Sequence, residues 1–417
     1  MRIVVPLAFA CLTLAACQDG DNGGATSGST AFVYVANSGG LPPNTISMYR
    51  VTPGTGVLGS AGAPVAAGTE PQQVVLDTSG KFAFVSNAGS ANLSSYLVNA
   101  SGSLTSLGAA VPVGTTPGTP TIDPLNRFLF VPNFGSSNLS VFTLNASTGS
   151  LTTGAGSPFS TGIGPQWVSL DNQGRFVWVN NVTAGTISMF FINPGSFPLL
   201  TPTPDSPRVV GSTPQRVAFS SLGPKLFAFV ANAGSDNVSV FEVNQTTGGI
   251  ITSPAGSPFT AGTAPNAVTI DPSGQFALVS NAGSSNVFVY GINSVSGALT
   301  SLSVVPTGTT PQQVTIHPSG NFVYVANIIS ENVSAYTLNQ VTGVLTEVAG
   351  SPFPTGGKLP QRVTIDPTGL FAFVSNQSSD TIAAFMINQS TGVLTAATGS
   401  PFPTGDAPEQ ATTAGTF

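Results

Sequence analysis

The strongest constraint on this sequence is a motif that recurs eight times at nearly constant spacing. Each copy holds an apolar run ending in Val-x-Asn or a close variant, a second run ending near an aromatic residue, and a Gly- and Pro-rich segment. Consecutive copies lie between 46 residues (Asn87 to Asn133) and 51 residues (Asn181 to Asn232) apart. A period of about 50 residues made of short strands is typical of a β-propeller with one four-stranded blade per repeat. The anchoring asparagines are Asn37, Asn87, Asn133, Asn181, Asn232, Asn281, Asn327 and Asn376.

One copy illustrates the expected order of strands. Residues 322–327 are β-branched and aromatic and too few for a helix, and both their faces are apolar, as in a strand packed between two other sheets. Residues 333–338 alternate, and residues 344–348 predict a short outer strand. Residues 360–365 begin the next blade and lead into Asp366-Pro367-Thr368-Gly369, where Asp caps the turn, Pro fixes φ and Gly takes the left-handed position.

The two ends of the repeat region complement one another. Residues 32–35 form a Val-x-Asn strand with no Pro-led strand before it, and residues 408–413 form a Pro-led strand with none after it. We therefore expect both ends to share one blade and close the ring, which removes exposed strand edges. Ala411 and Thr413 stand where the other copies have Val and Ile, so we expect this seam to be the weakest.

Charge is sparse, with 10 Lys and Arg against 16 Asp and Glu in 417 residues. Phosphate backbones require clustered cations, so this composition argues against a nucleic-acid partner. Gly and Pro are abundant, but their strict period marks them as turn residues rather than as signs of disorder.

The N-terminus is typical of an export signal. Arg2 and the apolar run 3–14 precede Leu14-Ala15-Ala16-Cys17, which resembles the bacterial lipoprotein signal. The resemblance implies that residues 1–16 are removed and that Cys17 carries the lipid anchor; a plain secretory signal is the alternative. Residues 17–30 predict a flexible tether and residues 31–417 the propeller.

Several features of the mature chain follow from this interpretation. Gln18 implies an outer-membrane location, on the periplasmic or the surface face. Cys11 falls in the removed segment, so no disulfide is expected. Membrane contact is expected through the anchor alone.

The unit 311–327, which reads Pro-Gln-Gln-Val-Thr-Ile-His-Pro-Ser-Gly-Asn-Phe-Val-Tyr-Val-Ala-Asn, resembles the repeat of the β-propeller lactonase family. That family contains propeller-type 6-phosphogluconolactonases and carboxymuconate lactonising enzymes. The unit is also similar to the YVTN repeats of microbial surface propellers. Members of the lactonase family usually have seven blades, which is the alternative to the eight counted here.

The chain departs from the lactonase pattern at the positions that the family uses for chemistry. Its Pro-Arg-His is replaced by sequences such as Pro311-Gln312-Gln313, and Glu follows none of the anchoring asparagines. The His/Arg/Glu set that the resemblance implies for lactone chemistry is therefore absent residue by residue.

By the same resemblance the Pro-led strands are innermost and begin at one mouth of the central channel. A ring of mostly amide side chains follows the prolines, and Arg216 and Arg362 stand one position further on. Amides and cations together suit a polyhydroxylated or anionic ligand. The alternative is that the amides only satisfy strand edges and order channel water. The ring is Gln72, Gly118, Gln166, Gln215, Asn266, Gln312, Gln361 and Glu409.

Other candidate residues have structural alternatives. His317 is either a general base near the channel or a turn cap, because it stands where five other copies have Asp. Those aspartates predict turn caps, with a calcium-binding ring as the alternative. Trp167 and Trp178 predict packing between blades, with stacking on a sugar as the alternative. No metal site and no cofactor is expected, since one His and no free Cys cannot form a zinc site.

Two functions are considered, and the missing Pro-Arg-His and Asn-Glu pairs favour the first. The first is a lipid-anchored extracytoplasmic propeller that binds a polar small molecule or a protein partner at the channel mouth. The second is a lactone hydrolase in which Arg216 and Arg362 hold an anionic substrate and His317 or Glu409 acts on water.

Overall fold

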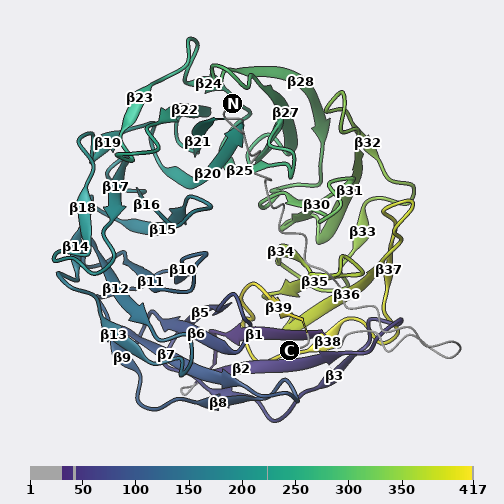
Figure 1. The fold of residues 1–417 in the computed structure, drawn as a ribbon. Coiled ribbons are helices and arrows are strands. Elements are labelled where there is room, and N and C mark those ends of the chain that lie inside the picture. The colour runs from purple at the N-terminus through teal and green to yellow at the C-terminus, as the bar shows by residue number, and fades with distance from the viewer. Residues whose placement is uncertain (1–30, 41–43, 223, 416–417) are drawn as a thin grey trace, which may run out of the picture.

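The computed structural model describes residues 31–40, 44–222 and 224–415. The regular elements of these residues are 39 β-strands, arranged in eight sheets around a central opening (Figure 1). The predicted signal peptide, Cys17 and the tether lie outside the described residues. Among those that are described, no helix is long and apolar enough to cross a membrane.

Each sheet is one blade, and the blades are numbered 1 to 8 around the ring. Blade 1 holds β1–β4 and β39, blade 2 holds β5–β9, blade 3 holds β10–β14 and blade 4 holds β15–β19. Blade 5 holds β20–β24, blade 6 holds β25–β28, blade 7 holds β29–β33 and blade 8 holds β34–β38. Consecutive blades are neighbours, so blade 4 lies across the channel from blade 8, and blade 1 across from blade 5 (Figure 1).

The strands occupy equivalent places in every blade. The innermost strands are β39 (Thr412–Ala414), β5 (Pro71–Leu76), β10 (Thr121–Ile122), β15 (Pro165–Leu170), β20 (Pro214–Leu222), β25 (Pro265–Ile270), β29 (Thr315–Ile316) and β34 (Pro360–Ile365). The second strands are β1 (Phe32–Asn37), β6 (Phe82–Asn87), β11 (Phe128–Asn133), β16 (Phe176–Asn181), β21 (Lys225–Asn232), β26 (Phe276–Asn281), β30 (Phe322–Asn327) and β35 (Phe371–Asn376).

The outer half of each blade is equally regular. The third strands are β2 (Thr45–Val51), β7 (Asn92–Val98), β12 (Asn138–Leu144), β17 (Thr186–Ile192), β22 (Asn237–Val243), β27 (Asn286–Ile292), β31 (Asn332–Leu338) and β36 (Thr381–Ile387). The fourth strands are β3 (Leu58–Ser60), β8 (Leu104–Ser106), β13 (Leu151–Thr153), β18 (Leu200–Pro202), β23 (Ile250–Thr252), β28 (Leu299–Pro306), β32 (Leu345–Glu347) and β37 (Leu394–Ala396).

Seven blades add a two-residue strand that pairs with the third strand, a detail that the sequence analysis did not predict. The outer strand is interrupted there by a Gly-Ser-Pro-Phe turn or its equivalent. Blade 6 has no such turn, and its outer strand β28 runs unbroken. The short strands are β4 (Val65–Ala66), β9 (Val111–Pro112), β14 (Phe159–Ser160), β19 (Arg208–Val209), β24 (Phe259–Thr260), β33 (Phe353–Pro354) and β38 (Phe402–Pro403).

The ends of the described chain close the ring as predicted. Strand β39 pairs antiparallel with β1, so that Tyr34 faces Thr412 and Phe32 faces Ala414. This makes eight blades, and the seven-bladed alternative is wrong. The Ser38 amide also donates to the Ala407 carbonyl at 3.1 Å, which ties the loop before β39 to the end of β1.

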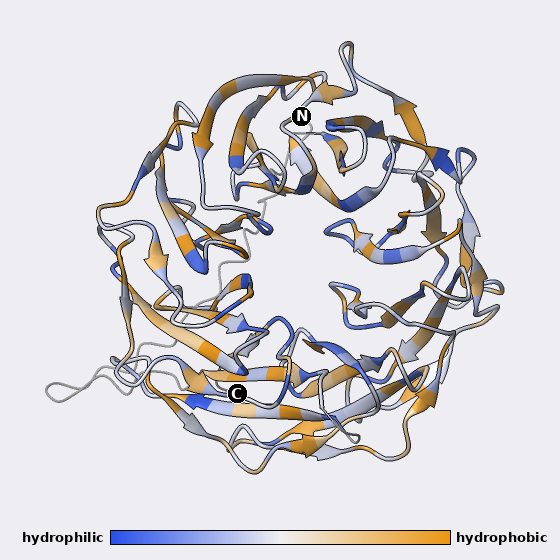
Figure 2. Ribbon diagram, turned by 180° about the vertical axis from the view of Figure 1, so that it is seen from behind, coloured by the Kyte–Doolittle hydropathy of each residue, from blue (hydrophilic) through white to orange (hydrophobic). Residues whose placement is uncertain are grey.

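The core lies between the blades. All six residues of β30 are buried, because one face packs on blade 6 and the other on blade 8. The Tyr324 hydroxyl crosses this boundary and donates to the Gly392 carbonyl at 2.9 Å. Figure 2 shows hydrophobic residues along the strands and hydrophilic ones on the inner loops around the central opening.

The repeated asparagine fixes the loop that leads to the channel. Asn327 is fully buried, and its Nδ2 donates to Asn332 Oδ1 at 2.8 Å and to Ser334 Oγ at 2.9 Å. A Cβ on Gly308, in the loop before the inner strand of the same blade, would lie 2.8 Å from the Asn327 side chain. Glycine is therefore required there, and the asparagine sets where each inner strand begins.

Candidate functional site

The starts of the eight inner strands enclose a cavity of about 580 Å³ at one end of the channel, here called the mouth cavity. The structure brings all the sequence-predicted ligand-binding residues and Glu409 to its wall. The residues directly after the eight inner-strand prolines form one ring on this wall, here called the second-position ring. They are Gln72, Gly118, Gln166, Gln215, Asn266, Gln312, Gln361 and Glu409. Its third-position residues are Gln73, Thr119, Trp167, Arg216, Ala267, Gln313, Arg362 and Gln410.

Both side-chain rings reach the cavity because the inner strands are irregular at their starts. In β20 the pairing with β21 skips from Pro214 to Val217, and β34 shows the same shift between Pro360 and Val363. A bulge of this kind turns adjacent side chains to the same side of a strand. The alternating pattern of an ordinary strand would have placed only one ring in the channel, so the sequence analysis missed the remaining third-position residues.

Arg216 and Arg362 are the cations of the mouth cavity among the described residues. The three ion pairs found in that part of the chain lie elsewhere, so neither arginine has a carboxylate within ion-pair distance. The Nε of Arg362 is buried without a hydrogen-bond partner. Two guanidinium groups thus face the channel without an ion pair to a described carboxylate, although Glu70 and Glu409 line the same cavity.

The surroundings of these arginines disfavour their charge. Burial among the inner strands lowers the pKa of Arg216. Burial and the charge of Arg216 together lower the pKa of Arg362 to about 9. An anion placed between them would relieve both effects, because an opposite charge favours the ionised form.

Glu409 is a carboxylate of the cavity wall with a fixed position. Its Oε1 accepts from Ser38 Oγ at 2.8 Å and from Gln377 Nε2 at 3.3 Å. Burial raises the pKa of Glu409, and the bonds from Ser38 and Gln377 counter part of that rise. Since both hydrogen bonds go to Oε1, Oε2 is left with no partner in the described protein.

Several amides of the second-position ring form hydrogen bonds with the protein or with one another. Gln72, Gln215 and Gln361 each donate to the backbone carbonyl two residues earlier, at 3.2 to 3.3 Å. Asn266 Nδ2 donates to Gln312 Oε1 at 2.8 Å. Several amides are thus bonded within the protein while they also line the cavity.

A second cavity of about 750 Å³ continues along the channel beyond the mouth cavity. Gln73, Thr119, Arg216 and Gln313 line both cavities and mark their junction. The wall of the second cavity carries threonine hydroxyls that are already used between blades, as Thr269 Oγ1 donates to the Val314 carbonyl at 2.9 Å. The hydroxyl of Thr269 is therefore already engaged within the protein.

His317 lies outside the mouth cavity, at the far end of its inner strand. The side chain is 3% exposed, and its Nε2 lies 2.8 Å from the Gly369 carbonyl of the next blade. Its Nδ1 accepts from the Ser319 amide at 3.1 Å. A carbonyl only accepts and an amide only donates, so the proton belongs on Nε2. Both ring nitrogens are occupied, and the geometry is that of a turn cap joined to its neighbour.

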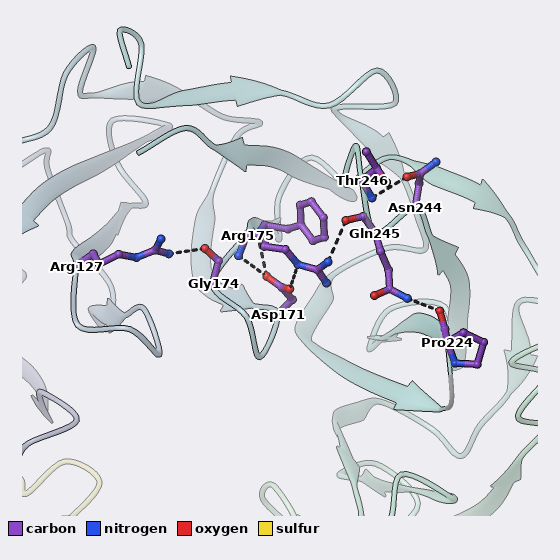
Figure 3. A network of polar contacts seen from close by, with 9 residues as sticks. Arg127, Asp171, Gly174, Arg175, Pro224, Asn244, Gln245 and Thr246 are labelled. Carbon is purple, nitrogen blue, oxygen red and sulfur yellow. Dashed lines mark hydrogen bonds and ion pairs between the residues drawn. The ribbon is translucent and has the colours of Figure 1, made fainter. Parts of the chain in front are cut away.

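The turn aspartates have the same capping geometry. Asp171 Oδ1 accepts from the Phe176 amide at 2.9 Å, and its Oδ2 pairs with Arg175 at 2.8 Å. Arg175 then donates to the Gln245 carbonyl of blade 5, and Arg127 of blade 3 donates to the Gly174 carbonyl (Figure 3). In the described residues no three His, Cys, Asp or Glu gather as a metal site would require.

The tryptophans separate into two roles. Trp178 is fully buried and meets Phe219 of the next blade edge-on at 5.3 Å, as predicted for packing between blades. Trp167 is only partly buried and lines the mouth cavity together with Phe134. The prediction of packing between blades therefore does not describe Trp167.

The fold and the cavity define a β-propeller closed around a polar channel. The sequence profile described as "Lactonase, 7-bladed beta-propeller" matches residues 24–119, 117–303, 211–352 and 313–406. The chain belongs to this lactonase family, and it has one blade more than the family description states. No curated protein sequence matches it significantly.

Solved structures with this fold include two of particular interest. A protein of Bacteroides uniformis, provisionally named a 6-phosphogluconolactonase, is 18% identical with a TM-score of 0.63, over 93% of this chain and 99% of that one. The periplasmic gluconolactonase of Pseudomonas aeruginosa is 17% identical with a TM-score of 0.61, over 93% and 100%. At such identities the likeness shows the fold alone.

Proposed function

We propose that this protein is a lactone hydrolase whose reaction takes place in the mouth cavity. The observation that carries the proposal is Glu409, a carboxylate held by Ser38 and Gln377 on the cavity wall with one oxygen unengaged. Family membership supports the reaction class. The names of the Pseudomonas and Bacteroides neighbours support a sugar lactone as the substrate class.

In the proposed reaction Glu409 acts as a general base. Its Oε2 takes a proton from a water molecule, whose oxygen attacks the lactone carbonyl carbon. The carbonyl oxygen becomes the oxyanion of a tetrahedral intermediate. The ring C–O bond then breaks, the leaving alkoxide takes the proton from Glu409, and the product is a hydroxy acid.

The arginines supply positive charge for this reaction. Arg362 lies on blade 8, next to the blade that carries Glu409, and is suited to stabilise the oxyanion. Arg216 lies on blade 5, across the channel from Glu409, and is suited to hold an anionic substituent of the substrate. His317 has no part in the proposal because its ring lies in a turn outside the cavity.

A lactone panel at near-neutral pH tests the proposal, with a protein-free blank subtracted because sugar lactones also hydrolyse spontaneously there. We expect Glu409→Gln to lower kcat at least 100-fold, because the amide cannot accept the proton. Glu70→Gln is the matched control, since Glu70 is an exposed carboxylate of the same cavity. Equal turnover by Glu409→Gln and the unaltered protein would contradict the proposal.

A binding module without turnover is the second candidate. It is favoured by the absence of the family's Pro-Arg-His and Asn-Glu pairs and by the amides that bond to one another. Saturable binding of a sugar acid, with no hydrolysis of any lactone in the panel, would support this candidate over the first.

We also propose that the protein is exported and anchored to the outer membrane through Cys17. The basis is the sequence Leu14-Ala15-Ala16-Cys17 after an apolar run. Metabolic labelling with a fatty acid tests this directly. Label should enter the unaltered protein and be absent from Cys17→Ser.

A further inference from the structure

Three departures from the repeat meet on one side of the mouth. Phe134 is the one aromatic residue that directly follows an anchoring asparagine, and Trp167 is the one aromatic residue of the third-position ring. Gly164 is the one glycine directly before an inner-strand proline. Phe134 belongs to blade 3, and Gly164 and Trp167 belong to the adjacent blade 4.

Gly164 is explained by the space that Phe134 needs. Gly164 has φ +74°, but its seven equivalents carry side chains at φ between 47° and 58°, so the left-handed backbone does not itself demand glycine. A Cβ on Gly164 would lie 3.1 Å from Cε2 of Phe134 and closer still to Thr183. The glycine therefore allows the phenylalanine ring to lie over the start of blade 4. The equivalents are Glu70, Thr116, Thr213, Ala264, Thr310, Leu359 and Ala407.

These aromatic rings are not part of the hydrophobic core. Phe134 is 42% exposed, and Trp167 is partly accessible, although both are large apolar side chains. Both line the mouth cavity, whose wall is otherwise mostly amide and charged. An accessible aromatic pair in a polar cavity leaves a flat apolar surface that water solvates poorly.

We infer that Phe134 and Trp167 form an aromatic subsite that binds the C–H face of a sugar ring. A pyranose has apolar faces and a polar rim, so it fits a cavity with one aromatic wall and amides around it. Blade 4 lies across the channel from blade 8, which places this wall opposite Arg362. The orientation of the ring, with its lactone carbonyl toward Glu409, rests on the proposed function; the subsite itself does not.

The two tryptophans permit a direct test. Trp178 is buried, and its Nε1 has no partner, so Trp178→Phe should preserve the fold and leave Trp167 as the single tryptophan, which can be excited selectively over the six tyrosines. We expect methyl glucopyranoside, which this chemistry cannot hydrolyse, to change the Trp167 emission in a saturable way. Phe134→Ala in this background should raise the Kd roughly tenfold, within the range for loss of one aromatic contact. Phe197→Ala is the matched control, because Phe197 is 81% exposed and lies outside the mouth cavity.

The outcomes separate this inference from the proposed function. No emission change with the sugar, or an unchanged Kd in Phe134→Ala, overturns the aromatic subsite whether or not lactones are hydrolysed. A saturable change that is weakened by Phe134→Ala supports the subsite even if every lactone is inert. Circular dichroism of each variant checks that the fold is retained. We expect it to be retained in Phe134→Ala because Phe134 is exposed.

Discussion

At the scale of single residues, the same repeat position serves different ends in different blades. His317 stands where Asp171 stands in blade 4, and both accept a backbone amide within their own turn. His317 adds a donor that an aspartate lacks and uses it on the Gly369 carbonyl of blade 8. In blade 3 the equivalent link, to the carbonyl of the turn glycine Gly174 of blade 4, comes from Arg127. The single histidine therefore links blade 7 to blade 8 through a hydrogen bond.

Replacing His317 should affect stability rather than turnover. His317→Ala loses the bonds to the Gly369 carbonyl and the Ser319 amide, while Gln389 Nε2 still donates to Gly369 and Ser319 is exposed, so we expect a loss of about 1 kcal/mol in the free energy of unfolding. His317→Asp should recover part of this loss, because Asp caps the turn but cannot donate to Gly369. Urea denaturation measures the loss, and lactone turnover or ligand affinity of the folded variant should be unchanged. A large fall in turnover without loss of stability would contradict this prediction and would indicate that His317 takes part in the reaction.

The pair Arg216 and Arg362 predicts a pH dependence of anion binding. Arg362 is charged below its pKa of about 9 and neutral above it, so affinity for an anion is retained at neutral pH and lost as pH rises through about 9. Sulfate is a suitable probe because its charge is constant in this range. Calorimetric titration between pH 7 and 10.5 should show the loss, and Arg362→Gln should bind weakly at every pH. Affinity that is flat across pH 9 in the unaltered protein would contradict the prediction.

At the scale of elements, threonines join the inner strands around the channel. Thr315 Oγ1 donates to the Val363 carbonyl at 2.7 Å, from blade 7 to blade 8. Thr364 and Thr412 continue the series across the closing blade, to the carbonyls of Ala411 at 2.8 Å and Val74 at 2.6 Å. The seam that looked weak in sequence is therefore bonded on both sides, although β39 pairs with β1 over only three residues.

Replacing a seam threonine by valine, which has nearly the same shape, should still lower the stability of the protein. Thr412→Val keeps the side-chain volume and loses the bond to Val74, so we expect a loss of about 1 kcal/mol in the free energy of unfolding. Val75 occupies the same position in blade 2, and Val75→Thr is the complementary variant, which should not destabilise the protein. Equal stability of Thr412→Val and the unaltered protein would show that the seam does not depend on this hydroxyl.

At the scale of the whole molecule, each blade buries its two faces against its neighbours. Only a closed ring gives all eight blades a neighbour on both faces. Trp178, in the cluster between blades 4 and 5, reports on packing far from the seam in blade 1. Cooperative unfolding would couple the two regions, as in other domains with one continuous set of contacts.

Deletion of residues 406–417 should open the ring and lower the stability of all its blades. The deletion removes β39 and Glu409 and exposes the inner edge of β1. In a Trp167→Phe background, where Trp178 is the single tryptophan, we expect the urea midpoint reported by Trp178 fluorescence to fall with that reported by circular dichroism. An unchanged Trp178 midpoint would mean that the blades unfold independently and that closure contributes little.

Much of the site could be anticipated from the sequence because the repeat itself aligns it. Once the prolines are in register, Gln72 and Glu409 must face the same mouth, and the structure places both on the mouth cavity. Trp167 and Phe134 carried a signal as well, since each is the one aromatic at its repeat position. For Trp167 stacking was only the alternative, because aromatic residues in so apolar a repeat more often pack between blades, and for Phe134 the signal was missed.

The sequence by itself determined the number of blades, the shared closing blade and the ring of residues that directly follow the inner-strand prolines, because these follow from local periodicity and from which strand each end lacks. Only the tertiary structure decided which side chains meet. Arg216 and Arg362 are brought together from blades 5 and 8, and His317 bonds to Gly369, 52 residues away. Such contacts depend on the bulges of the inner strands and on the curvature of the closed ring, which no single repeat encodes.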